Sequence, residues 1–359
     1  MTRAVLLSEH DPALWAARWA RGEVAAELPY GAEALHQHGV TTTTVPVSGA
    51  RWAAKVRAVA EHRSGLVLER PLRGLAAVRR ADLVIALLEA QGMLPAMLKG
   101  RGIPPYAGRP LVAVTCWLAD DLRAADPATR RRTVRRLAAV DLLTHFGSGE
   151  SGILVDAGFD ERRLLHVDLG VSAGYFTPDG RQRDLDVLAV GQDRGRDYAT
   201  LFEAVRGTAL SVHVVCRPGN VAGLDVPPNV EVSGPVPLAA YRDLLRRARV
   251  VAVPTRELAY PTGSSVALEA AASGCAVVAT GTPGLRDHLV DGTTAVLVGV
   301  GDADGWRSAL TALHSDGERR AALGAAARAD VLDRFTTERM WARIVAALRE
   351  RDLLPAAER

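Results

Sequence analysis

The sequence predicts an α/β protein of two domains, each built on a parallel β-sheet with helices on both faces. The chain has 359 residues, which is too long for one ordinary core and suits two domains of roughly 150 to 180 residues each. Short apolar, β-branched runs alternate with longer Ala-, Leu- and Arg-rich segments of helical period, and this alternation is typical of parallel sheets. A polar stretch at residues 177–183 separates two series of such runs and is interpreted as a linker.

The predicted strands are the short apolar runs that lie between the helical segments. In the first half of the chain they are Ala4–Leu7, Gly65–Leu68, Leu83–Ala86 and Leu111–Thr115. In the second half they are Val187–Val190, Ser211–Cys216, Val250–Val253, Ala276–Ala279 and Ala295–Val298. The predicted boundaries are therefore an N-terminal domain at residues 1–176, a C-terminal domain at 184–335 and a final segment at 336–359. That final segment is amphipathic, and we expect it to form a helix that packs back towards the N-terminal domain.

Composition and charge exclude several classes of protein. Hydrophobic residues make up 48% of the chain and charged residues 24%, which is ordinary for a soluble globular protein. The apolar runs are too short for a membrane-spanning helix or a signal peptide, so we expect a cytoplasmic protein. The net charge of +3 is too small to imply nucleic-acid binding. The arginine cluster at residues 130–136 is interpreted as a solvated helix face, with contact to an anionic membrane surface as the alternative.

The cysteines argue against a disulfide framework and against a structural zinc site. Cys116, Cys216 and Cys275 lie far apart in the sequence and form no Cys-x-x-Cys pair. We interpret the cysteines as small buried apolar residues.

The first informative loop follows the strand that ends at Val190. In an open parallel sheet the ligand binds beyond the carboxyl ends of the strands, so the residues that follow each strand matter most. Residues 190–197 contain two glycines and two arginines, Arg194 and Arg196. Glycine lets the backbone approach a ligand closely, and arginine pairs with phosphate oxygens. A surface loop with solvated arginines is the alternative.

The second informative loop leads from the strand 250–253 into a predicted helix. A Thr-Gly-Ser-Ser cluster at Thr262–Ser265 precedes the helix, which is expected to end at Gly274. Unpaired N–H groups and the positive end of the helix dipole favour phosphate binding there. Glu269 lies four residues after Ser265, hence on the same helix face, where its carboxylate can accept hydrogen bonds from ribose hydroxyls. An ordinary N-capped helix with a surface glutamate explains the same residues.

The stretch from Val250 to Gly301 resembles the donor-binding region of retaining GT-B glycosyltransferases of the family 4 type. The matching residues are Pro254-Thr255, Glu269-Ala270, Gly274, 276–280, Gly284 and Asp291-Gly292. The loop that begins Val190-Gly191 resembles the diphosphate-binding loop of that family, with Arg196 where lysine is usual. The resemblance implies a GT-B fold, which is α/β with two Rossmann-like doubly wound domains facing a central cleft. It also implies a metal-independent enzyme that moves a sugar from a nucleotide-diphosphate donor to an acceptor hydroxyl or other nucleophile, with retention of configuration.

The same resemblance implies roles for individual residues. Arg194 and Arg196 are the expected catalytic residues, because they would neutralise the leaving diphosphate. Glu269 is the expected ribose ligand, and the amides of Gly263, Ser264 and Ser265 are expected on the phosphates. The full set of expected donor-binding residues is Gly191, Arg217, Val236, Thr262, Gly263, Ser264, Ser265 and Glu269. No cofactor is expected, since the UDP- or GDP-linked sugar is itself a substrate.

Two positions depart from the family pattern. Pro261 stands eight residues before Glu269, where the family usually has a glutamate, and Thr115-Cys116-Trp117 stands where a histidine is common. These departures keep two alternatives open. One is a catalytically inactive nucleotide-binding protein, and the other is a sugar-nucleotide epimerase or phosphorylase on the same fold.

The N-terminal half is interpreted as the side that binds the acceptor, an unidentified small molecule or glycan. His10, Asp11, Tyr30 and Trp117 are the candidate acceptor contacts. Trp15 and Trp19 lie at helical spacing, so they either stack on the acceptor or form a packed stripe of the core. His145 and His166 are interpreted as structural.

Overall fold

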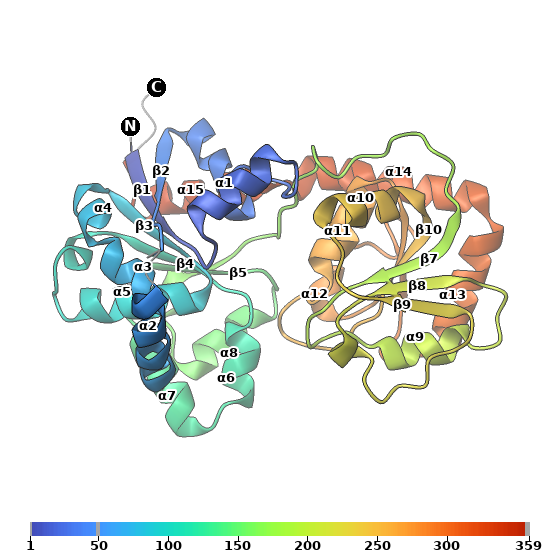
Figure 1. The fold of residues 1–359 in the computed structure, drawn as a ribbon, viewed down its shortest axis with the longest axis horizontal. Helices are drawn as coiled ribbons and strands as arrows, with labels where there is room; N and C mark the ends of the chain where they lie inside the picture. Colours follow the sequence, from blue (N-terminus) through green and yellow to red (C-terminus); the bar gives the residue numbers. More distant parts are fainter. Residues whose placement is uncertain (1, 48–50, 356–359) are drawn as a thin grey trace. The chain divides into compact units, whose positions relative to one another are not determined.

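The computed structural model describes residues 2–47 and 51–355, and the chain divides into two compact units. Unit 1 comprises Met1–Arg21, Ala26–Val167 and Met340–Arg359. Unit 2 comprises Gly22–Ala25 and Asp168–Arg339. Each unit has its own parallel sheet of six strands (Figure 1), so the predicted α/β class with two parallel sheets is confirmed.

The chain passes from unit 1 to unit 2 at Val167, earlier than the boundary predicted at residue 176. The reason lies in the core of unit 2, where Val171, Ala173 and Phe176 are buried. The last helix, α15 (Thr337–Glu350), belongs to unit 1 from Met340 onward. Its Trp341 is fully buried, and the indole Nε1 donates a hydrogen bond to the carbonyl oxygen of Tyr30 at 2.9 Å.

The sheet of unit 1 has the strand order β2-β1-β3-β4-β5-β6, and all neighbouring strands are parallel. Its strands are β1 (Thr2–Leu7), β2 (Val40–Thr44), β3 (Leu83–Leu87), β4 (Leu111–Val114), β5 (Leu142–His145) and β6 (Leu164–His166). Its α-helices, besides α15, are α1 (Pro12–Ala20), α2 (Arg51–Ser64), α3 (Glu69–Arg73), α4 (Leu75–Arg80), α5 (Glu89–Gly100), α6 (Leu118–Ala124), α7 (Pro127–Leu137) and α8 (Glu150–Ala157). Short 3₁₀ segments are η1 (Pro29–His38), η2 (Tyr106–Gly108) and η3 (Glu161–Arg163).

The predicted strand Gly65–Leu68 is wrong, because these residues connect α2 to α3. Gly65 has a φ of 61°, a left-handed conformation that glycine adopts easily after the end of a helix. The second strand is β2 instead, whose sequence Val-Thr-Thr-Thr-Thr is β-branched but polar. It lies at the edge of the sheet and only Val40 in it is buried, so a search for apolar runs misses it.

The sheet of unit 2 has the order β12-β11-β10-β7-β8-β9, again with all neighbouring strands parallel. Its strands are β7 (Leu185–Val190), β8 (Val212–Val215), β9 (Val230–Ser233), β10 (Ala248–Val253), β11 (Ala276–Thr280) and β12 (Val296–Val298). Its helices are α9 (Tyr198–Val205), η4 (Pro218–Asn220), α10 (Leu238–Arg247), α11 (Ser264–Ala272), α12 (Pro283–Arg286), α13 (Ala303–Ser315) and α14 (Gly317–Arg334).

The core of unit 2 lies on both faces of its sheet. Val251 and Val253 of β10 pack in one cluster, with residues of α10, α11 and α14. Val250 and Ala252 pack in the other, with residues of α9 and α13. Because successive side chains of a strand point to opposite faces, a strand buried on both faces is a continuous apolar run. This explains why the apolar runs of the second half were good predictors of its strands.

Strand order reverses at one place in each sheet. In unit 2 the chain moves outward from β7 to β9 on one side and from β10 to β12 on the other, so the reversal lies between β7 and β10. In unit 1 the corresponding pair is β1 and β3. Ligands of open α/β sheets bind beyond the carboxyl ends of the strands at such reversals.

Among the described residues, no helix is long and apolar enough to cross a bilayer.

Candidate functional site

The loops after β7 and β10 meet at the strand reversal of unit 2. Backbone hydrogen bonds join them, from Asp197 N to Pro254 O at 3.1 Å and from Arg256 N to Gly195 O at 2.8 Å. Arg196 and Thr255 also form an isolated antiparallel bridge. The two loops predicted to bind phosphate are thus held together by their backbones.

Arg196 is the central side chain of this site. Its side chain is 3% exposed, and its Nε donates to Asp193 Oδ2 at 2.8 Å. The other carboxylate oxygen of Asp193 accepts from Thr262 Oγ1 at 2.5 Å and from Gly195 N at 2.9 Å. Burial favours the protonated form of Asp193, but the charge of Arg196 and these hydrogen bonds hold its pKa below the usual range. Asp193 therefore stays ionised and fixes the arginine.

Glycines let the two loops close around the guanidinium. A Cβ built on Gly191, whose φ is 156°, would collide with Arg196 Nε. A Cβ built on Gly263, whose φ is 87°, would lie 2.5 Å from Val253 Cγ1 and 3.2 Å from Arg196 Nη1. Only glycine fits at these positions without strain. The Arg196 side chain therefore lies against the N-cap of α11, which is Gly263.

Three polar atoms of this site are buried without a hydrogen-bond partner among the described residues. They are Arg196 Nη1, Thr255 Oγ1 and Ser264 Oγ. A buried polar group left unpaired costs about 1 to 3 kcal/mol, so native structures contain few of them. The three residues are neighbours, because a Cβ on Gly263 would contact both Arg196 Nη1 and Thr255 Cγ2. This cluster is suited to a ligand with several oxygen atoms.

The helix start differs in one detail from the expectation. The N–H of Ser264 donates to Pro261 O at 3.0 Å, so this amide is engaged within the turn, and its expected role on a phosphate stays a prediction. Ser264 faces the site through its buried hydroxyl. Gly263 supplies the N-cap and Ser265 is exposed in the first turn, where helical N–H groups have no intrahelical acceptor.

Glu269 lies one turn further along α11 and is partly buried. Its Oε2 accepts a hydrogen bond from the hydroxyl of Tyr241, a buried residue of α10, at 2.8 Å. Burial raises the pKa of Glu269 to about 7, although the Tyr241 bond and the charge of Arg196 act in the opposite direction. Glu269 is therefore not the solvated surface glutamate of the alternative interpretation.

The remaining predicted residues of unit 2 lie on loops at the same edge of the sheet. Arg194 is exposed on the same loop as Arg196. Arg217 is exposed after β8, and its backbone N–H donates to Asn220 Oδ1 at 3.2 Å. Val236 follows β9 and packs partly buried against the core. All three follow carboxyl ends of the same sheet, and the hydrogen-bond partner of the Arg196 side chain is Asp193 among the described residues.

Sequence reasoning missed two side chains that organise the site. Asp193 holds Arg196 and Thr262, and Tyr241 holds Glu269. An acid three residues before the predicted phosphate-binding arginine was the available signal for Asp193. Tyr241 gives no signal, because it comes from a helix whose position depends on the tertiary fold.

Residues from two parts of unit 1 gather at the carboxyl end of β1. Glu9 Oε1 accepts from the Tyr30 hydroxyl at 2.8 Å and lies 3.1 Å from His10 Nε2. Burial favours the protonated form of Glu9, but His10 and Tyr30 outweigh it and hold the pKa of Glu9 below the usual range. Asp11, by contrast, is the N-cap of α1 and accepts from Leu14 N at 3.0 Å. Trp117 is partly buried at the N-cap of α6.

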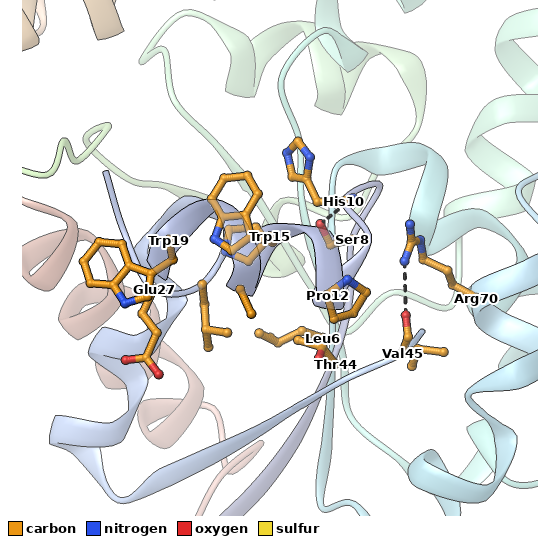
Figure 2. A pocket seen from close by; sticks show the side chains of 13 residues that line it. Leu6, Ser8, His10, Pro12, Trp15, Trp19, Glu27, Thr44, Val45 and Arg70 are labelled. Atoms are coloured by element: carbon orange, nitrogen blue, oxygen red, sulfur yellow. Dashed lines mark hydrogen bonds between the residues drawn. The ribbon is translucent and has the colours of Figure 1, made fainter. Parts of the chain in front are cut away.

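A cavity of about 200 Å³ opens beside these residues in unit 1. Figure 2 shows Trp15 and Trp19 along one side of it, with Glu27 below Trp19 and Arg70 at the far end. Helix α1 has no buried residue, so its tryptophans are not a packed stripe of the core. Among the described residues, no group of three or more His, Cys, Asp or Glu side chains is placed to hold a metal ion.

Comparison with known proteins finds a family match within the C-terminal half. Residues 187–316 match the family model described as glycosyl transferases group 1. The D-inositol 3-phosphate glycosyltransferase of Geodermatophilus obscurus is 31% identical over 257 residues, 62% of this chain and 56% of that protein. The enzyme of the same name from Xylanimonas cellulosilytica is 42% identical over 100 residues, 28% of this chain and 23% of that protein. The match thus spans little more than half the length of the Geodermatophilus protein and less than a quarter of the Xylanimonas protein.

Solved structures show the same fold over the whole chain. Sucrose-phosphate synthase from Thermosynechococcus elongatus superposes with a TM-score of 0.70 at 16% identity, covering 98% of this chain and 99% of that one. Anabaena HepE in complex with UDP-glucose superposes with a TM-score of 0.66 at 15% identity, covering 98% and 100%. With the two parallel six-stranded sheets, these likenesses show that the chain has the GT-B fold, and residues 187–316 match the glycosyl transferases group 1.

Proposed function

We propose that the chain transfers a sugar from a nucleotide-diphosphate donor to an acceptor hydroxyl, with retention of anomeric configuration and without a metal ion. The observation that carries the proposal is the buried, unpartnered Nη1 of Arg196 beside the start of α11. A buried cation next to free helical N–H groups suits a diphosphate, which brings both negative charge and several acceptor oxygens.

The described contacts support a role for each donor-side residue. The diphosphate oxygens would accept from Arg196 Nη1, from the Ser264 hydroxyl and from the amides of Gly263 and Ser265. Arg194, exposed on the same loop, would add a second positive charge. Glu269 would accept from the ribose hydroxyls, since Tyr241 engages only its Oε2. Arg217 and Val236 follow β8 and β9, from which the base would be contacted.

The transfer step depends on stabilisation of the charge on the leaving group more than on a covalent intermediate with the protein. A bond forms between the acceptor oxygen and the anomeric carbon while the bond from that carbon to the diphosphate breaks. The departing diphosphate takes the electron pair, and it also takes the proton of the acceptor hydroxyl. Arg196 faces the negative charge that develops on the leaving group, which is where fixed electrostatic stabilisation is most effective.

Names of related proteins agree with this proposal. Anabaena HepE has been solved with UDP and glucose, and separately with UDP-glucose. The curated relatives are glycosyltransferases that act on D-inositol 3-phosphate. We infer from these names that a UDP-linked sugar is the first donor to test and that a polyol hydroxyl is a reasonable acceptor.

A direct test combines binding with turnover. The melting temperature is measured with UDP, GDP, ADP and dTDP sugars, because a ligand that binds the native state stabilises it by RT ln(1 + [L]/Kd). The best donor is then incubated with acceptors, and both the released nucleotide and the anomeric configuration of the product are followed by NMR. Net transfer with retention is expected. Absence of stabilisation by all four donors would refute the proposal.

Pro261 favours one other candidate, a nucleotide-binding protein without catalysis. It occupies the place of the usual glutamate, and it is buried against Gly284, where a Cβ would lie 2.9 Å from Pro261 Cα. This protein would be stabilised by a nucleotide sugar but would release no nucleotide from any donor. Interconversion of the donor sugar, or its release by inorganic phosphate, would instead indicate the epimerase or phosphorylase.

A further inference from the structure

The cavity of unit 1 has a buried cation in its wall. We propose that this cavity binds the acceptor of the transfer reaction, and that the acceptor is a single-ring polyol with an anionic group, a phosphate or a carboxylate, that pairs with Arg70. The identification of the ligand as an acceptor rests on the proposed function. The binding of an anionic ring compound does not, and can be tested without a donor.

Arg70 of α3 is 6% exposed and lines the cavity. Its Nη1 donates to Val45 O at 3.1 Å and its Nη2 to Glu9 O at 2.8 Å. Both partners are neutral carbonyl groups. No carboxylate of the described residues lies within 4.0 Å of its nitrogens as an ion-pair partner.

The charge of Arg70 is thus held in place but not neutralised. Burial lowers the pKa of Arg70, and Asp11, Glu69 and Glu9 oppose this from beyond ion-pair distance. An arginine stays protonated in proteins, and buried charges are normally paired. The guanidinium has five N–H donors, so some donors remain after it has bonded to the two carbonyl groups. A ligand phosphate or carboxylate would supply the missing negative partner.

The opposite end of the cavity is suited to a hydroxylated ring. Figure 2 shows Glu27 beside Trp19 at this end, with Trp15 between them and Arg70. Trp15 is fixed by a hydrogen bond from its Nε1 to Ala26 O at 3.1 Å. An indole face stacks well on an apolar ring face, and a carboxylate accepts hydrogen bonds from hydroxyls. Glu27 would also repel an anionic group, which fixes the orientation with that group at Arg70.

The size of the cavity limits the ligand. Its volume is about 200 Å³, below the roughly 300 to 1,000 Å³ of sites that hold drug-sized molecules. One ring with one small substituent suits this space. An extended glycan would have to leave most of its rings outside.

The test measures binding of matched compounds to the full chain in the absence of nucleotide. The pairs are glucose with glucose 6-phosphate, glucose with glucuronate, and myo-inositol with its 3-phosphate, and inorganic phosphate is measured alone. Affinities come from calorimetry and from tryptophan fluorescence. At least one anionic ring compound is expected to bind tenfold or more tightly than both its neutral counterpart and inorganic phosphate. The pair with the largest ratio shows whether phosphate or carboxylate is preferred.

Variants assign that preference to Arg70. Arg70→Gln should reduce the anionic and neutral compounds of each pair to similar affinity, whereas Arg70→Lys should keep part of the preference. Arg73→Gln is the matched control, because Arg73 lies on the same helix and also donates to a backbone carbonyl, that of Pro46, but does not line the cavity. Nucleotide affinity and melting temperature show whether each variant is folded.

The outcomes separate this proposal from the proposed function. Equal affinity for neutral and anionic rings in the wild-type protein, no binding of any ring compound, or inorganic phosphate as the best ligand would each overturn it, and none of these requires a variant to fold. A preference that survives in Arg70→Gln would also overturn it. If anionic rings bind as expected while no nucleotide sugar binds, the proposed function fails, but the proposal that the cavity binds anionic ring compounds stands.

Discussion

Replacing Arg196 by alanine is expected to weaken nucleotide-diphosphate binding and to weaken transfer more strongly still. A hydrogen bond to a charged group contributes about 1.5 to 3 kcal/mol, so loss of the bond from Nη1 should weaken binding about 10- to 150-fold. Stabilisation of the leaving group grows in the transition state. We therefore expect kcat/KM to fall by about 2 to 4 kcal/mol, or about 30- to 1,000-fold.

The structure also predicts what the same change does to stability. Arg196→Ala removes the unpaired Nη1, which favours the folded state, but it also leaves Asp193 Oδ2 without its ion-pair partner. Asp193 keeps the bonds from Thr262 and Gly195, so the folded state should survive with a modest loss. Arg196→Lys keeps the charge, but a single ammonium lacks the planar fork that lets Nε hold Asp193 while Nη1 faces the ligand. We expect it to fall between wild type and alanine.

The assay is calorimetry with the preferred nucleotide diphosphate, followed by initial rates of nucleotide release. Arg206→Ala is the matched control, since Arg206 is half-exposed and pairs with Asp225 at the surface of the same unit. Unchanged affinity and unchanged kcat/KM in a folded Arg196→Ala protein would refute the assignment. Equal losses in the control would show that the effect is general.

Four further predictions concern the donor side. Nucleotide affinity should be the same in EDTA and in Mg²⁺, because no metal ligand set was found among the described residues; a requirement for Mg²⁺ in calorimetry would contradict this. Glu269→Gln should weaken nucleotide binding by about 1 to 3 kcal/mol, and equal affinities would contradict the ribose role. In the folded protein the pKa of Glu269 is raised to about 7 from 4.5. The free energy of unfolding of the wild type should therefore fall as the pH rises from about 4.5 to above 7. Urea titrations should show a smaller fall in Glu269→Gln. Gly191→Ala should lose about 1 to 3 kcal/mol of stability because its Cβ meets Arg196, and a melting temperature equal to that of wild type would contradict the close approach.

The sequence predicted the central strands well and the edges poorly. Strands such as β10 and β11 are buried on both faces, so their sequences are apolar throughout. The edge strand β2 has only one buried residue, and its other four residues are threonines. Strand β9, at the edge of the other sheet, alternates apolar and polar residues. An apolar-run criterion measures burial rather than strand pairing.

The candidate site was predictable where function leaves a local pattern. Glycines next to arginines, and a Gly-Ser-Ser start to a helix, pointed to Arg196 and to α11. The sequence could not rank Arg194 against Arg196, because only the fold shows that one is exposed and the other buried. It also could not show that Tyr241 meets Glu269 across 28 residues of chain, or that Arg70 meets the loop after β1.

The unpartnered atoms around Arg196 have a consequence for the end of the catalytic cycle. In the proposed function, Arg196 Nη1 and the Ser264 hydroxyl bind the diphosphate and not the sugar. The spent nucleotide keeps every one of these contacts after the sugar has left, and its release would again leave the buried donors unpaired. The nucleotide product should therefore compete strongly with the donor, and its departure should limit turnover at saturating substrate. Under the proposed function, a cell would therefore depend on a reaction that removes the nucleoside diphosphate.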